Sequence, residues 1–244
     1  MYDVCIFDFY GTLADIHTDE NKSEVWEKLA HFYSWYQCCY RPLELKEQYE
    51  ILTKTLSRGK EGIRNDSHES HPEIKIEEVF ALLFSQKGIM ADEHLVRAAA
   101  QFFRILSTDY IRTYDGTLEM LSALRENGKK MYLLSNAQRI FTEYEMNQLQ
   151  ITPYFDAIYI SSDYGYKKPD PRFFRKLMEE CRISPETGIM VGNDGICDIQ
   201  GAKQLGLDTL YVHSNISPEE ITPDADYVLE QMDMERIKEI LLQK

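Results

Sequence analysis

Apolar positions divide this chain into a first strand, a helical stretch and a final stretch of alternating strands and helices. Residues 4–7 form an unbroken apolar run, which is typical of a strand buried on both faces of a parallel sheet. Residues 15–110 carry apolar positions at the three- and four-residue spacing of amphipathic helices. From residue 111 onward, short apolar runs alternate with segments of helical periodicity. Strands separated by helices of this length predict right-handed crossovers and a parallel sheet.

The expected elements set the domain organisation. Between residues 15 and 110, we expect helices at 19–40, 43–56, 77–87 and 92–110 and a polar loop at 57–71. After residue 110, we expect strands at 130–134, 157–160, 188–191, 209–212 and 227–229. The run at 4–7 is too short to stand alone, so it must join the later strands. The predicted fold is therefore an α/β protein with a Rossmann-like parallel sheet (1–14 and 111–244) and an inserted all-helical unit (15–110).

Composition and charge limit the partners. The chain has 244 residues and a net charge of −14 with no basic block, which argues against nucleic acid and against an anionic membrane surface. No apolar stretch approaches a membrane span, and we expect no signal peptide. The five cysteines are scattered without a Cys-x-x-Cys pair, which indicates reduced thiols and a cytoplasmic protein. An anionic substrate would need a metal ion or particular Lys and Arg side chains.

Polar side chains follow the expected strands. Asp8 ends the first strand, Ser135 and Asn136 end the strand at 130–134, and Asp194 follows the strand at 188–191. Ligands of open α/β sheets bind outside the carboxyl ends of the strands. We therefore expect these side chains to gather at one site, which the inserted helices are well placed to cover.

Four stretches resemble the haloacid dehalogenase-like (HAD) superfamily of hydrolases. They are DFYGTL from Asp8, LLSN ending at Asn136, KKPDPRFF from Lys167 and VGNDGICDIQGA from Val191. Each stretch alone is a weak signal, but all four occur in the order of the family. The inserted helices resemble the helical cap of that superfamily.

The resemblance implies a role for each residue that follows a strand. Asp8 is the expected nucleophile, because a carboxylate can attack a phosphoryl group or a carbon and form a covalent intermediate. Ser135 and Asn136 are expected to bind the transferring group, and Lys168 to supply fixed positive charge. Lys168 is favoured over Lys167 because the lysine of the family directly precedes the proline. Ser135 also has a structural interpretation, as the N-cap of the next helix.

Oxygen ligands beside the nucleophile predict Mg²⁺ as the cofactor. Mg²⁺ favours carboxylates, substrate phosphate and water. The expected protein ligands are Asp8, the main-chain carbonyl of Tyr10, Asp194 and Asp198. The spacing of the last two lets the first bind the metal and the second orient the site. Asp198 could instead compensate the charge of a helix N-terminus.

Tyr10 departs from the commonest pattern of the family, in which an aspartate two residues after the nucleophile acts as general acid and base. A phenol with a pKa near 10 is a poor acid at neutral pH. The sequence Tyr-Gly-Thr-Leu from Tyr10 resembles the 2-haloacid dehalogenases, which work without metal and release a halide that needs no proton. Asp194 and Asp198 point the other way, because several carboxylates are hard to hold together without a cation.

Three functions follow from this conflict. The favoured one is a Mg²⁺-dependent phosphatase that acts on a small phosphorylated metabolite through an aspartyl-phosphate intermediate. It could survive the loss of a general acid, which costs about 10² to 10⁴ in rate, on good leaving groups such as acyl or aryl phosphates. The alternatives are a metal-independent 2-haloacid dehalogenase and a weakly active or inactive protein that binds a ligand or partner. We expect a monomer or a homodimer with a small-molecule substrate.

Overall fold

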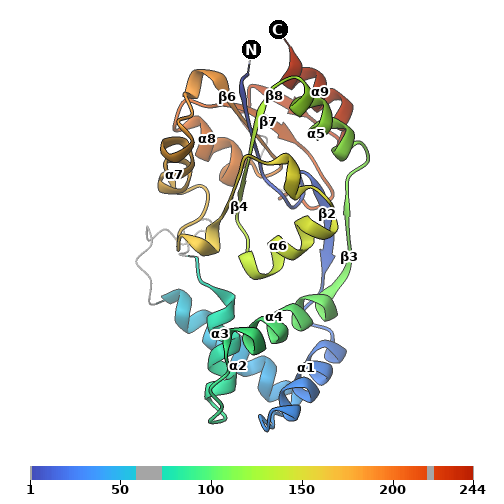
Figure 1. The fold of residues 1–244 in the computed structure, drawn as a ribbon, viewed down its shortest axis with the longest axis vertical. Helices are drawn as coiled ribbons and strands as arrows, with labels where there is room; N and C mark the ends of the chain where they lie inside the picture. Colours follow the sequence, from blue (N-terminus) through green and yellow to red (C-terminus); the bar gives the residue numbers. More distant parts are fainter. Residues whose placement is uncertain (1, 59–72, 219–222, 244) are drawn as a thin grey trace.

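A six-stranded parallel sheet and a separate group of helices make up the molecule (Figure 1). The computed structural model describes residues 2–58, 73–218 and 223–243. The sheet has the order β5-β4-β1-β6-β7-β8. Its strands are β1 (Val4–Phe7), β4 (Lys130–Ser135), β5 (Ala157–Ile160), β6 (Gly188–Gly192), β7 (Asp208–Val212) and β8 (Tyr227–Leu229). The predicted α/β fold with a parallel sheet is confirmed.

Strand β1 lies in the middle of the sheet and places Asp8 at its carboxyl edge. Phe7 pairs with Leu133 of β4 on one side and with Val191 of β6 on the other. The Asp8 N–H then donates a hydrogen bond to the Val191 carbonyl at 3.0 Å. The sheet grows outward from β1 in both directions, so the residues after β1 lie at the crevice where such folds bind ligands.

Helices cover both faces of the sheet. On one face, α5 (Thr117–Glu126) and α9 (Met234–Leu242) pack on Cys5 and Phe7. On the other face, α7 (Pro171–Cys181) and α8 (Gly201–Lys203) pack near Ile6. This alternation explains why β1 is apolar at every position, because each face of the strand is buried. We call this α/β part the core.

Four helices, here called the helical unit, form a second hydrophobic cluster. They are α1 (Ser23–Trp35), α2 (Pro42–Arg58), α3 (Ile76–Ser85) and α4 (Glu93–Ser107). The rings of Trp26, Tyr49, Phe80 and Phe103 meet at its centre, one from each helix. The polar loop expected at 57–71 lies mostly outside the described residues. None of the helices in the described ranges is both long and apolar enough to cross a membrane.

The expectation of helices alone between residues 15 and 110 was wrong at both ends. There, β2 (Ala14–Thr18) and β3 (Thr108–Thr113) form an antiparallel ribbon between the core and the helical unit. The helix expected to reach residue 110 ends at Ser107. Buried Asp15 holds the ribbon, since it accepts a hydrogen bond at 2.8 Å from Arg112 on the partner strand. Local periodicity could not reveal this pairing, because the two strands are far apart in the sequence.

Candidate active site

Lys168 is buried, and its ammonium group lies between two carboxylates. The Nζ atom is 2.7 Å from Oδ1 of Asp8 and 2.7 Å from Oδ1 of Asp198. Asp8 follows β1, Asp198 lies in the helical segment Gly195–Gln200 after β6, and Lys168 precedes α7. The structure thus brings together three of the predicted site residues from separate parts of the chain. Both carboxylates compensate the buried positive charge.

The ionisation of this group follows from burial and charge. Burial raises the pKa of Asp198 to about 7, against the lowering effect of the Lys168 ammonium. Burial lowers the pKa of Lys168, but the carboxylates of Asp198 and Asp8 outweigh it and leave that pKa above its ordinary value. Lys168 therefore stays cationic next to Asp8, as an electrostatic role requires.

Asn136 fixes the main chain of Lys168. Its side-chain oxygen accepts a hydrogen bond from the Lys168 N–H at 2.8 Å, and its side-chain amide donates one to the Lys168 carbonyl at 2.9 Å. This paired contact joins the segment after β4 to the segment before α7. Asn136 thus positions the lysine, a role that we did not expect beside substrate binding.

Ser135 ends β4, and its side chain is buried. Among the residues that the structure describes, its Oγ has no hydrogen-bond partner. Polar groups this deeply buried are normally paired. The N-cap interpretation was wrong, because helix α6 (Arg139–Gln148) begins four residues later with Gln138 as its N-cap. The orphan hydroxyl points to a bound group that accepts a hydrogen bond.

Asp194 and Asp198 interact at the start of the helical segment Gly195–Gln200, of which Asp194 is the N-cap. Oδ1 of Asp194 accepts hydrogen bonds from the Ile196 and Cys197 N–H groups at 2.9 and 2.8 Å. The Asp194 N–H donates to Oδ2 of Asp198 at 3.0 Å. Both oxygens of Asp198 are thus engaged by the protein, which fits an orienting role. The Cys197 thiol also interacts with the Asp194 carboxylate.

Asn193 is a residue that the sequence reasoning missed. Its side-chain oxygen accepts a hydrogen bond from the Thr12 hydroxyl at 3.3 Å, and its amide donates to the Ser214 hydroxyl at 3.3 Å. Gly11 packs directly against it with φ of +84°, and a side chain there would overlap the Asn193 amide. Its place directly before Asp194, within the stretch VGNDGICDIQGA, could have indicated that Asn193 lies at the site.

Tyr10 directs its hydroxyl toward α6. The hydroxyl donates a hydrogen bond to Oε2 of Glu145 and lies 3.0 Å from Oγ1 of Thr142. Oε1 of Glu145 in turn accepts a hydrogen bond from Nε of Arg104 on α4 at 2.6 Å. Burial, followed by the charge of Glu145, raises the pKa of Tyr10 above its ordinary value. Neither Glu145 nor Arg104 was among the residues predicted from the sequence.

The oxygens beside Asp8 are of the kind that Mg²⁺ binds. Within the described ranges, no group of three or more His, Cys, Asp or Glu side chains is arranged to hold a metal ion. A site would therefore combine two carboxylates, Asp8 and Asp194, with the main-chain carbonyl of Tyr10. Only Oδ1 of Asp8 has a hydrogen-bond partner among the described residues, so its other oxygen is left for a ligand. Oxygen donors of this kind, completed by substrate and water, suit Mg²⁺.

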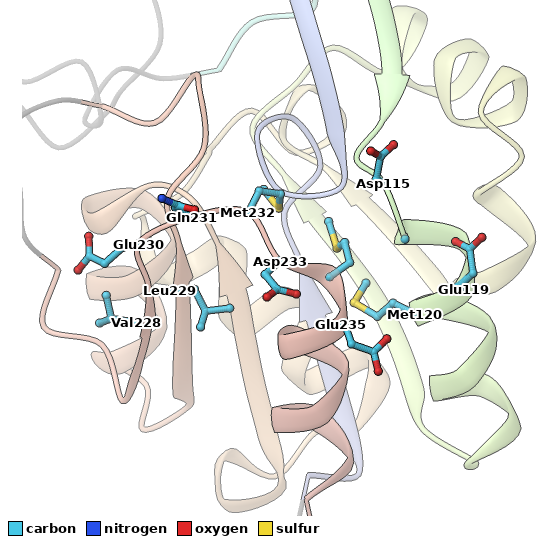
Figure 2. A pocket seen from close by; sticks show the side chains of 12 residues that line it. Asp115, Glu119, Met120, Val228, Leu229, Glu230, Gln231, Met232, Asp233 and Glu235 are labelled. Atoms are coloured by element: carbon cyan, nitrogen blue, oxygen red, sulfur yellow. The ribbon is translucent and has the colours of Figure 1, made fainter.

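A hollow lies away from this group of residues (Figure 2). It has a volume of about 740 Å³ and opens between the start of α5 and the segment that joins β8 to α9. Its acidic lining is formed by Asp115, Glu119, Glu230, Asp233 and Glu235. None of the predicted site residues, all of which the structure describes, lines it. Its negative charge disfavours an anionic substrate, whereas Lys168 favours one.

A family model of haloacid dehalogenase-like hydrolases matches residues 2–206. The chain belongs to this family. Every predicted site residue of this HAD-like hydrolase, from Asp8 to Asp198, falls within the matched range. The membership inferred from four short stretches is thus confirmed, and the protein is a hydrolase.

Two curated relatives of this HAD-like hydrolase are named glyceraldehyde 3-phosphate phosphatase. The one from Pyrococcus furiosus is 29% identical over 126 residues, which are 50% of this chain and 52% of the relative. The one from Methanopyrus kandleri is 25% identical over 199 residues, 82% of this chain and 83% of the relative. A solved 2-haloacid dehalogenase from Pseudomonas syringae pv. Tomato DC3000 has a TM-score of 0.63 at 17% identity, covering 99% of this chain and 98% of that chain. That structural likeness shows the fold alone.

Proposed function

We propose that this HAD-like hydrolase is a Mg²⁺-dependent phosphatase that acts on a small phosphorylated metabolite through an aspartyl-phosphate intermediate. The carrying observation is the buried Lys168 ammonium 2.7 Å from the Asp8 carboxylate. A fixed positive charge at that place stabilises a phosphoryl group under attack. The names of the two phosphatase relatives support a phosphorylated substrate.

The residues divide the reaction between them. An oxygen of Asp8 attacks phosphorus, so a new oxygen–phosphorus bond forms while the bond to the leaving oxygen breaks. Lys168 compensates the charge on the phosphoryl oxygens, and the free hydroxyl of Ser135 donates a hydrogen bond to one of them. Water then splits the aspartyl phosphate, which releases phosphate and restores the Asp8 carboxylate. Asn136 and Asp198 keep Lys168 in place.

Asp8, the carbonyl of Tyr10 and Asp194 would hold the Mg²⁺ ion. Bound there, the ion supplies Lewis-acid stabilisation to the phosphoryl oxygens. Asp198 would not bind the ion itself, because its carboxylate binds Lys168 and the Asp194 N–H and so orients them.

The environment of Tyr10 limits the substrates. Its proton is directed at Glu145 and its pKa is raised, so it cannot serve as a general acid at neutral pH. Acyl and aryl phosphates, whose leaving groups depart without a proton, should therefore react faster than alkyl phosphates.

We further propose that residues 15–110 act as a cap over a core of residues 1–14 and 111–244. Gln138, at the start of α6, supports this division. Its side-chain oxygen accepts a hydrogen bond from the Ile76 N–H, and its amide donates to the Ile74 carbonyl, both at 2.9 Å. The helical unit thereby reaches the segment that carries Ser135.

A metal-independent 2-haloacid dehalogenase is the second candidate. Tyr10 replaces the general acid, and a halide leaves without a proton, so this reaction does not need that acid. A ligand-binding protein with little or no turnover is the third. Hydrolysis of p-nitrophenyl phosphate, with Mg²⁺ and with a chelator, separates them when Asp8→Asn serves as the control. Metal-dependent turnover that the variant loses supports the phosphatase. Chloride release from a 2-chloro acid without metal contradicts it, and no turnover in either assay favours the binding protein.

A further inference from the structure

Glu145 is a buried acid that joins two distant segments of the chain. Its carboxylate accepts hydrogen bonds from the Tyr10 hydroxyl and from Nε and Nη2 of Arg104, the latter two at 2.6 and 3.3 Å. Tyr10 lies two residues after Asp8, whereas Arg104 lies on helix α4 of the helical unit. The carboxylate therefore connects the segment of the proposed nucleophile to the proposed cap.

Helix α6, which carries Glu145, packs against both parts of the molecule. Ile140 and Phe141 belong to the hydrophobic cluster of the helical unit, whereas Met146 belongs to that of the core. The Arg104 guanidinium lies over the rings of both Phe141 and Tyr10, 5.2 and 5.7 Å from their centres. Figure 1 shows α6 at the boundary between the sheet and α4. The position of α6 is thus set from both sides.

The start of α6 is tied to the same two parts. Ser135 and Asn136 lie within four residues of its first residue, and its N-cap Gln138 binds the main chain of the helical unit at Ile74 and Ile76. Contacts therefore link α4 through Glu145 to Tyr10, and the helical unit through Gln138 to the segment that carries Ser135.

We propose that Glu145 is a positioning residue that holds the Asp8–Tyr10 segment in its working position through the docked helix α4. The proposal rests on the phosphatase function proposed above. Arg104 compensates the buried charge of Glu145, and the Tyr10 hydroxyl donates a further hydrogen bond to the same carboxylate, so the three side chains form one buried network.

The test is a set of variants assayed with p-nitrophenyl phosphate and Mg²⁺. Glu145→Gln keeps the shape of the side chain and removes its charge, and Tyr10→Phe keeps the ring and removes the hydroxyl. We expect each to lower kcat by on the order of tenfold, with KM changed less than kcat. Because they break one unit, the double variant should lose little more than Glu145→Gln alone. Additive losses would overturn the proposal.

Arg139→Gln is the matched control. Arg139 lies on the same helix and pairs with Asp163 of the core at 2.6 Å, but it does not contact Tyr10 or Arg104 among the described contacts. We expect this variant to keep the wild-type kcat. An equal loss in Arg139→Gln would mean that any loosening of α6 has this effect, and the proposal would be wrong.

Failure of this inference and failure of the proposed function give different results. If the wild type is active and Glu145→Gln keeps both kcat and KM, the inference is overturned and the function stands. If the wild type hydrolyses no phosphate ester, the function fails, and amide hydrogen exchange decides the coupling. Faster exchange at residues 8–13 in Glu145→Gln and Arg104→Met, but not in Arg139→Gln, supports the coupling. Unchanged exchange contradicts it.

Discussion

Nζ of Lys168 lies 2.7 Å from Oδ1 of Asp198, and both side chains are only 1% exposed. At this depth the pair is not screened by water, and the same ammonium also contacts Asp8. Asp198 therefore holds the cation that the proposed nucleophile needs. Asp198 uses both its carboxylate oxygens in hydrogen bonds to the protein, one to Lys168 and one to the Asp194 N–H.

Replacement of Lys168 tests this electrostatic role. Lys168→Met leaves the carboxylates of Asp8 and Asp198 without their shared cation. We expect kcat for p-nitrophenyl phosphate to fall by roughly 10²-fold or more. The free energy of unfolding, measured with urea, should fall by about 3 to 5 kcal/mol, because a buried pair is broken. A variant with wild-type kcat would show that the ammonium does not act on the phosphoryl group.

Ser135→Ala should lower activity without lowering stability, whereas Lys168→Met should lower both. The buried hydroxyl has no partner among the described residues, so its removal relieves a desolvation cost of roughly 1 to 3 kcal/mol at most. We expect the free energy of unfolding to stay equal or to rise, while kcat/KM falls by roughly 10²-fold. Urea unfolding and steady-state kinetics on one preparation measure both. A loss of stability would indicate that Ser135 has a structural partner.

Tyr10→Asp should widen the range of leaving groups. An aspartate at this position can protonate an alkoxide, a step that the wild-type phenol, bound to Glu145, does not provide. We expect turnover of an alkyl phosphate to rise by about 10²-fold or more relative to that of p-nitrophenyl phosphate. Equal ratios in a folded variant would show that protonation of the leaving group does not limit the enzyme.

Gly11→Ala should destabilise the turn after the nucleophile. The φ of +84° disfavours any side chain, and the added methyl would overlap the Asn193 amide. We expect a loss of more than about 1 kcal/mol in the free energy of unfolding. Gly128→Ala is the control, because its φ is +74° and no atom lies within 4 Å of the added methyl. Equal losses of stability in the two variants would show that the positive φ alone, and not the overlap with Asn193, destabilises Gly11→Ala.

The sequence predicted the fold because the decisive patterns are local. The apolar run at 4–7 and the later strands identify a parallel sheet, and this sheet alone places the ends of β1 and β4 together. The resemblance added Lys168, whose choice over Lys167 agrees with the buried position of Lys168. Local patterns determine where a strand ends and therefore which side chains lie at the edge of the sheet.

Long-range side-chain contacts could not be predicted in the same way. Glu145 and Arg104 look like ordinary polar residues of two helices, and only the packing of α4 on α6 brings them to Tyr10. The β2–β3 ribbon was missed because its strands lie on opposite sides of the helical unit in the sequence. The sequence did not show where α6 begins, so Ser135 could be interpreted as its N-cap; the structure places the N-cap at Gln138.

The proposed covalent intermediate on Asp8 can be trapped directly. The protein is mixed with acetyl phosphate and Mg²⁺, quenched with acid and reduced with borohydride, which converts an aspartyl phosphate to homoserine. Mass spectrometry of the peptide that contains residue 8 then locates the product. We predict homoserine at position 8 in the wild type and none in Asp8→Asn. Turnover of acetyl phosphate without homoserine at position 8 would contradict the account.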